Sequence, residues 1–150
     1  MNTKIVKNAK HLLTIVAGGV LFFSAVNLYM ANIVTINDDM PKTIQSGSTV
    51  PVTITIEKGN VNGFGRFTCT LPKGFVASSS DQNFKFEDNT ITILWVVLPT
   101  SKTFSFTFNV TAPENASESF VFSAKFSYVD DNEKQFTEIA PREVAVIGSS

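Results

Sequence analysis

Residues 63–75 read GFGRFTCTLPKGF and alternate apolar with polar side chains around Cys69, the only cysteine of the chain. Successive side chains of a β-strand point to opposite faces, so Phe67, Cys69 and Leu71 share one face and the polar residues between them share the other. This period of two predicts a half-buried strand in which Cys69 is a small buried side chain. The LPKGF end predicts a turn that leads into the next strand.

The same period of two continues through the chain from residue 33, without a convincing helical period. Further strands are predicted in TVPVTITIEKG (49–59), FKFEDNTITILWVVLP (84–99), KTFSFTFNVTA (102–112), SFVFSAKFSYV (119–129) and EVAVI (143–147). Turn residues separate them, among them Asp88–Asn89. Roughly seven to nine short strands of this kind predict an all-β fold, a two-sheet antiparallel sandwich of immunoglobulin-like type, with a jelly roll as the alternative.

One predicted strand, residues 91–98, is apolar on both of its faces. Its odd-numbered residues form the first face: Ile91, Ile93, Trp95 and Val97. Its even-numbered residues, from Thr92 to Leu98, form the second. Such a strand is either covered on both sides or exposes an adhesive surface. One hypothesis is therefore a shielded central strand, and the other is a docking or oligomerisation surface on the first face, centred on Trp95.

The N-terminus has the composition of a membrane segment. Residues 1–11 contain lysines and no acid, and residues 12–31, LLTIVAGGVLFFSAVNLYMA, carry no charge. An apolar run of about 20 residues forms a helix of about 30 Å, which matches the hydrocarbon core of a bilayer. Cleavage after Ala25 or Ala31 would place an aromatic residue where signal peptidase requires a small one. The sequence thus favours an uncleaved transmembrane signal-anchor over a cleaved signal peptide or a buried soluble helix.

The charges on either side of this span predict its orientation. Lysines precede the span and Asp38–Asp39 follow it, so the N-terminal flank is expected in the cytoplasm and the rest of the chain in the periplasm. We expect a single-pass protein of the inner (cytoplasmic) membrane, with a linker at residues 32–42 and a β-sandwich at residues 43–150. Small side chains within the span could pack against a partner helix: Thr14, Ala17, Gly18 and Ser24.

The residues after the span lack the usual catalytic combinations. The only histidine is His11, so Cys69 has no imidazole to activate it and a Cys/His metal site cannot form there. Asp38–Asp39 and Asp130–Glu133 could bind calcium but lack the spacing of a calcium loop, so solvated turn acids are the preferred interpretation. Without the three N-terminal lysines, nine basic residues stand against thirteen acidic ones, and this net charge of −4 argues against nucleic acid. We therefore expect that the protein is not an enzyme and that it binds no metal and no cofactor.

Several segments together resemble poorly characterised β-sandwich domains of bacterial cell-envelope proteins, close to immunoglobulin-like and cohesin-like sandwiches. The shared pattern contains a Gly-Phe pair, a Leu-Pro-x-Gly-Phe turn and a tryptophan strand that ends in Leu-Pro. The matching positions in this chain are Gly63–Phe64, Leu71–Pro72, Gly74–Phe75, Trp95 and Leu98–Pro99. The resemblance covers most of residues 43–135. It implies a fold and an envelope location, and it brings no catalytic residue and no known ligand.

Three functional hypotheses follow from these features. The first is a non-catalytic, membrane-tethered envelope protein whose sandwich binds other envelope proteins, as a subunit or accessory factor of a secretion, motility or surface-assembly complex, while residues 12–31 contact the lipid bilayer. The second is an adhesive or ligand-binding sandwich for carbohydrate or peptide that is secreted after signal cleavage. The third is a homo-oligomer in which residues 32–45 pair as an edge strand with another copy.

Overall fold

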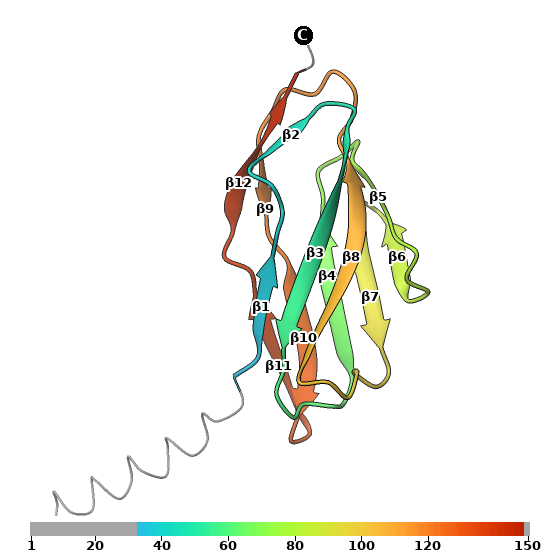
Figure 1. The fold of residues 1–150 in the computed structure, drawn as a ribbon, viewed down its shortest axis with the longest axis vertical. Coiled ribbons are helices and arrows are strands. Elements are labelled where there is room, and N and C mark those ends of the chain that lie inside the picture. The colour runs from blue at the N-terminus through green and yellow to red at the C-terminus, as the bar shows by residue number, and fades with distance from the viewer. Residues whose placement is uncertain (1–32, 149–150) are drawn as a thin grey trace, which may run out of the picture. The chain divides into compact units, whose positions relative to one another are not determined.

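The computed structural model describes residues 33–148, which Figure 1 shows in colour. A compact unit begins at Val34. Its strands are β1 (Thr35–Asp38), β2 (Thr43–Gln45), β3 (Thr49–Glu57), β4 (Gly65–Thr70), β5 (Val76–Ser78), β6 (Phe84–Glu87), β7 (Thr90–Trp95), β8 (Thr103–Thr111), β9 (Phe120–Phe122), β10 (Lys125–Asp130), β11 (Glu133–Glu138) and β12 (Arg142–Ile147). The described residues contain no helix, so the all-β prediction is confirmed for this part of the chain.

The strands form two large sheets and a smaller third one (Figure 1). The four-stranded sheet has the order β1-β3-β8-β5, and the five-stranded sheet has the order β11-β10-β4-β7-β6. The three-stranded sheet has the order β2-β12-β9, and β2 and β12 are its parallel pair. The strand pairs of the two large sheets are antiparallel, as predicted. The third sheet was not predicted, and the predicted strand number is too low.

The structure has more strands than predicted in part because the single strand predicted at residues 119–129 is two strands. It breaks at Ser123–Ala124 into β9 and β10. The break lets the chain change partners, because β9 pairs with β12 whereas β10 pairs with β4 and β11. The apolar alternation continues across the break, and sequence periodicity therefore gave no sign of it.

The predicted linker at residues 32–42 is wrong for most of its length. β1 pairs with β3 from Thr35↔Glu57 to Asp38↔Ile54, so this segment is an edge strand of the sandwich. Ile36 is 9% exposed and Met40 is 4% exposed. A few apolar residues at alternate positions were enough to bury this segment, although its composition is mainly polar.

The opening stretch forms a wall of the core. β4 lies between β10 and β7, and its residues Phe67 and Cys69 are buried, as predicted. Phe67 meets Phe106 of the opposite sheet edge to face, with ring centroids 4.9 Å apart. A side chain at Gly65 would meet Leu98, since a Cβ there would lie 2.5 Å from the Leu98 Cδ2 atom. Glycine at this position therefore permits the close packing of the core around β4.

Two hairpin turns use non-glycine residues with positive φ. Asp88 and Asn89 have φ values of 50° and 61° and join β6 to β7. Asp131 and Asn132 have φ values of 48° and 61° and join β10 to β11. Two consecutive residues with positive φ are typical of type I′ turns, which Asn and Asp tolerate better than other non-glycine residues. The predicted turn at Asp88–Asn89 is confirmed.

We expect Cys69 of the native protein to react with an aromatic disulfide reagent at least about a thousandfold more slowly than free cysteine, because only the thiolate attacks. Burial, with a smaller contribution from the negative charge of Asp38, raises the pKa of the Cys69 thiol to about 12. The rate can be followed by absorbance on the native full chain near neutral pH, with the urea-unfolded chain as the control. A native rate equal to that of free cysteine would show that the inward face of β4 is open to solvent.

The predicted cytoplasmic flank at 1–11, the predicted span at 12–31 and its proposed packing residues Thr14, Ala17, Gly18 and Ser24 lie outside the described residues. In the part of the chain that is described, no helix is long and apolar enough to cross a bilayer. The membrane anchor therefore stays a prediction from sequence.

Candidate functional site

Three of the four residues predicted to form a docking surface lie in the core. Ile91 and Ile93 are 0% exposed and Trp95 is 9% exposed. β7 pairs with β4 and β6, and this face of it turns toward the four-stranded sheet, where the Trp95 ring lies 5.4 Å from that of Phe104. The predicted surface is therefore wrong for these three residues. The fourth, Val97, follows the strand and is 69% exposed.

The second apolar face is exposed at Leu94 of β7 and at Val96, which follows the strand, whereas its last residue, Leu98, is 2% exposed and lies in the core. Leu94 is 42% exposed and Val96 is 80% exposed. The register places Arg66 of β4 beside Leu94, then Ser127 of β10 beside Arg66, and then Phe136 of β11 beside Ser127. A row of side chains therefore crosses the outer face of the five-stranded sheet, with Arg66 near its middle.

We call Phe64, Arg66, Leu94, Val96 and Phe136 the Arg66 patch. Phe64 is 38% exposed and Phe136 is 59% exposed. Phe64 precedes Arg66 by two residues. Its carbonyl oxygen accepts a hydrogen bond from the backbone N–H of Val129 in β10, so Phe64 extends the backbone pairing of β4 with β10 by one residue beyond the strand. Single exposed apolar side chains are ordinary on protein surfaces, but several on one sheet face indicate a contact surface.

The guanidinium of Arg66 has no acidic partner among the described residues. Within residues 33–148, no carboxylate lies within ion-pair distance of it. Beyond Ser127 in the row, the Phe136 ring is covered in part by the ammonium of Lys125, whose Nζ lies 4.3 Å from the ring centroid. Arginine and aromatic side chains are enriched among the residues that contribute most to protein interfaces. The patch thus fits an apolar partner surface that carries a carboxylate.

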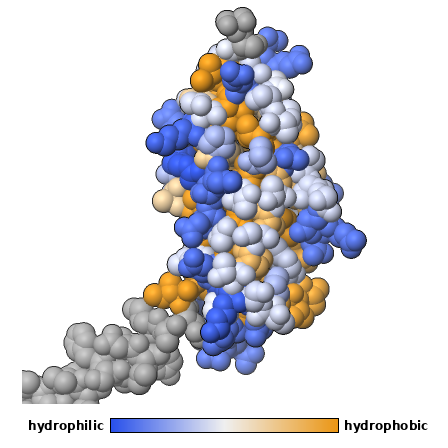
Figure 2. Space-filling model, in the orientation of Figure 1, coloured by the Kyte–Doolittle hydropathy of each residue, from blue (hydrophilic) through white to orange (hydrophobic). Residues whose placement is uncertain are grey.

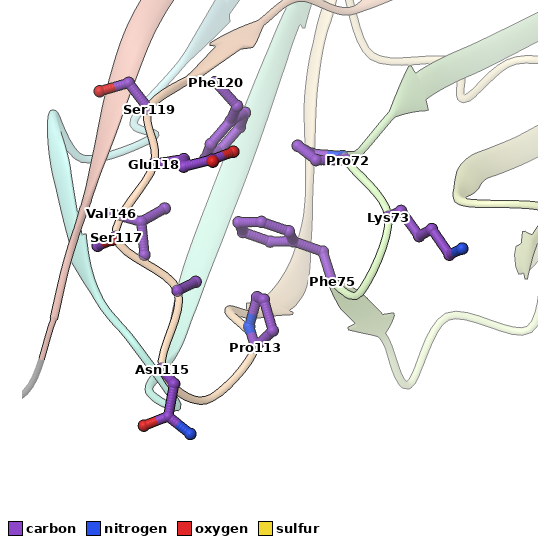
Figure 3. Close-up of a pocket in the computed structure, with 11 residues that line it drawn as sticks. Pro72, Lys73, Phe75, Pro113, Asn115, Ser117, Glu118, Ser119, Phe120 and Val146 are labelled. Atoms are coloured by element: carbon purple, nitrogen blue, oxygen red, sulfur yellow. The ribbon is translucent and has the colours of Figure 1, made fainter.

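A pocket of about 260 Å³ lies between the turn after β4 and the loop before β9 (Figure 3). Phe75 and Phe120 contribute aromatic walls, and their rings meet edge to face with centroids 4.9 Å apart. The other apolar lining residues come from both sides of the pocket and from β12: Pro72, Pro113, Ala116 and Val146. Lys73 and Glu118 are its charged lining residues, and this composition suits a side chain or a small ligand with an apolar body.

The outer face of the four-stranded sheet has a different chemistry. Figure 2 shows a largely white surface over β3 and β8, where hydroxyl side chains alternate along both strands. The hydroxyls pair across the two strands: Thr49 with Thr111 at 2.7 Å, Thr53 with Thr107 at 2.9 Å, and Thr55 with Ser105 at 2.9 Å. Because these hydroxyls already bond to one another, this face presents fewer groups for contacts with a partner than the Arg66 patch does.

Asp38 and Asp39, which the sequence left open as calcium ligands, both bond to the protein. Asp38 Oδ1 accepts a hydrogen bond from the Met40 N–H at 2.9 Å, and its carboxylate pairs with Arg142. Asp39 Oδ1 accepts the Thr53 N–H at 2.6 Å. Among the described residues, no group of three or more His, Cys, Asp or Glu side chains is placed to hold a metal ion.

Lys58 is the buried cation of the described fold. It is 1% exposed, and its Nζ donates a hydrogen bond to Asn62 Oδ1 at 3.1 Å. Burial lowers the pKa of its ammonium group. Lowered pKa values are found in nucleophilic lysines, but the hydrogen bond of Lys58 bridges the loop after β3, which is a structural role.

Comparison with known proteins bears on the fold. No protein-family model and no curated protein matches the chain. Among solved structures, the non-cellulosomal cohesin from the hyperthermophilic archaeon Archaeoglobus fulgidus is similar at a TM-score of 0.51 and 15% identity, over 77% of this chain and 91% of that chain. The predicted immunoglobulin-like fold is thereby supported. The ASH/PapD-like domain of human CEP192 (PapD-like domain 7) aligns at a TM-score of 0.41 and 11% identity, over 77% of this chain and 84% of that chain. At these identities the likeness concerns the fold alone.

Proposed function

We propose that this chain is a non-catalytic, membrane-tethered protein of the bacterial cell envelope whose sandwich binds another envelope protein. Its role is that of a subunit or accessory factor in a secretion, motility or surface-assembly complex. Residues 12–31 anchor it in the inner membrane, with the N-terminus in the cytoplasm and the sandwich in the periplasm. The observation that carries the proposal is the Arg66 patch.

The patch has the properties of a modest protein interface. Leu94 and Phe136 lie on paired strands, and Phe64 and Val96 directly adjoin paired strands, which hold these side chains in place before a partner arrives and so lower the entropy cost of binding. Neighbouring strands are about 4.8 Å apart, so a patch from β7 to β11 spans about 15 Å. A standard interface covers about 800 Å² on each partner. The patch is therefore suited to form the apolar centre of such an interface, with polar residues of the same sheet at its rim.

We expect Arg66→Glu and Val96→Asp each to reduce recovery of the partner at least about tenfold, which corresponds to about 1.4 kcal/mol of binding free energy. The tagged full chain is crosslinked in membranes of the producing bacterium, purified, and its partner quantified by mass spectrometry. Lys102→Glu and Val76→Asp are the matched controls, because both positions are exposed and lie outside the patch. Equal recovery with all four variants would contradict the patch as the binding surface.

The same preparation tests the tether. The mass of the mature chain shows whether it begins at residue 1 or 2, as a signal-anchor requires, or near residue 26 or 32, as signal cleavage would produce. A cleaved chain recovered from the medium would favour the secreted, ligand-binding alternative.

A further inference from the structure

The short strand β9 has a free edge. It pairs with β12 on one side, and within the described residues no strand pairs with its other side. This side of β9 lacks a partner strand because β4 ends at Thr70 and the chain then passes through Pro72 to β5, which belongs to the opposite sheet. A free strand edge presents backbone N–H and C=O groups to which another strand can bond.

The pocket of Figure 3 borders this edge. Residues 117–120 line one side of it, and Pro72 and Phe75 line the other. The side chain of Val121, in the middle of β9, is 63% exposed, whereas Phe120 beside it contributes to the pocket wall. A strand added here would thus lie next to a preformed, partly apolar pocket, which is the arrangement used in recognition by strand addition.

The charge at the pocket is negative on its β9 side. In Figure 3 the Glu118 side chain extends across the pocket toward Pro72, whereas Lys73 extends away from it. In the described part of the chain, no cation lies within ion-pair distance of the Glu118 carboxylate. The residues after the predicted span carry a net charge of −4. An unpaired carboxylate beside two aromatic rings is complementary to a cation on an aliphatic stem.

We propose that an extended segment of a partner protein adds to the free edge of β9 and places an arginine or lysine side chain in this pocket. The aliphatic stem of that side chain packs against Phe75 and Phe120, and its cationic group pairs with Glu118. Backbone hydrogen bonds to β9 supply affinity, and the pocket supplies selectivity. This site lies apart from the Arg66 patch and does not depend on the function proposed for that patch.

A labelled peptide tests the proposal on the full chain in detergent micelles. The probe is a fluorescein-labelled peptide of about nine residues, the length of an ordinary strand, in which threonine and valine alternate around a central arginine. Matched peptides carry norleucine or glutamate at the centre, and a fourth carries N-methyl groups at alternate residues, which block strand pairing. Fluorescence anisotropy gives the affinities. We expect the arginine peptide to bind at least about tenfold more tightly than each of the others.

Variants of the protein separate the two parts of the site. Glu118→Gln is expected to weaken the arginine peptide about tenfold and to leave the norleucine peptide unchanged, which is the coupling expected for a direct pair. Glu133→Gln, at an exposed position of β11 outside the pocket, is the matched control and should change neither affinity. Equal binding of the arginine and glutamate peptides would overturn the assignment of a basic side chain. Unchanged binding after N-methylation would overturn strand addition, and no saturation by about 1 mM arginine peptide would overturn the site.

Discussion

Replacing Trp95 by aspartate is expected to unfold the sandwich. Trp95 is 9% exposed, and its ring lies within 6.1 Å of those of Phe104, Phe106 and Phe126. Truncation of a buried tryptophan costs about 3–5 kcal/mol, and an unpaired carboxylate in its place costs several more. Since domains are stable by about 5–15 kcal/mol, a loss of this size leaves most molecules unfolded or close to it.

The measurement is urea unfolding of the full chain in detergent, followed by far-ultraviolet circular dichroism because the variant lacks the only tryptophan. Val96→Asp is the matched control, since Val96 is the next residue and is 80% exposed. We expect its unfolding free energy to stay within about 0.5 kcal/mol of the parent, as for most surface substitutions. A Trp95→Asp variant with parental stability would show that Trp95 belongs to an exposed surface after all.

The second large effect concerns the ion pair between Asp38 of β1 and Arg142 of β12. The guanidinium binds both carboxylate oxygens: Nη1 donates to Oδ2 at 2.9 Å, and Nη2 donates to Oδ1. Nη2 also donates to the Met40 carbonyl oxygen at 3.0 Å. The Asp38 side chain is 6% exposed and that of Arg142 is 34% exposed, so the acid is the more buried partner. The pair thus ties the first strand of the fold to the last one.

Asp38→Asn is expected to lower the unfolding free energy by about 2–3 kcal/mol. Removing one partner of a fully buried pair costs about 3–5 kcal/mol, and the partial exposure of Arg142 reduces this because water can solvate its freed charge. Asp88→Asn is the control, because Asp88 is an exposed turn residue whose positive φ asparagine tolerates. Chemical unfolding near neutral pH measures both variants, and equal stability of the two would contradict a stabilising role for the pair.

The same carboxylate should make the stability depend on pH. Burial alone would raise the pKa of Asp38, but the hydrogen bonds from Arg142 and the Met40 N–H outweigh it and hold the pKa below its ordinary value of 3.8. The unfolded chain therefore binds the proton more readily than the folded one. The contribution of Asp38 is fully present above the unfolded pKa and is lost as the pH falls through the folded pKa. Unfolding free energies measured at falling pH should drop more steeply for the parent than for Asp38→Asn, and parallel curves would contradict this assignment.

Most of the long strands were predictable because the alternation of apolar and polar residues within each of them indicates a strand. The alternation in β3, β4, β7 and β8 spans enough residues to indicate a half-buried strand, and the Asp88–Asn89 turn has a recognisable chemistry. The edge strand β1 was missed because its apolar residues are few, and its burial depends on pairing with β3. The break between β9 and β10 was missed because it follows from a change of partner strand and not from a change of local sequence.

The candidate site was predictable only in part. The sequence pointed to residues 91–98 as a strand with two apolar faces, and that strand does border the Arg66 patch. The choice of the Trp95 face as the surface was wrong. Phe64 and Phe136 could not be assigned to the patch from sequence, because they reach it through the pairing of β4 with β10 and of β10 with β11.

The sequence by itself determined the period of two, the burial of Phe67, Cys69 and Leu71 and the absence of histidine after the predicted span, because these depend on neighbouring residues or on composition. Only the tertiary structure decided which face of β7 is buried. Both faces are apolar, and local periodicity cannot rank them. The pairing of β7 with β4 and β6 turns the Trp95 face toward the aromatic rings of β8, and this leaves Leu94 in solvent beside Arg66.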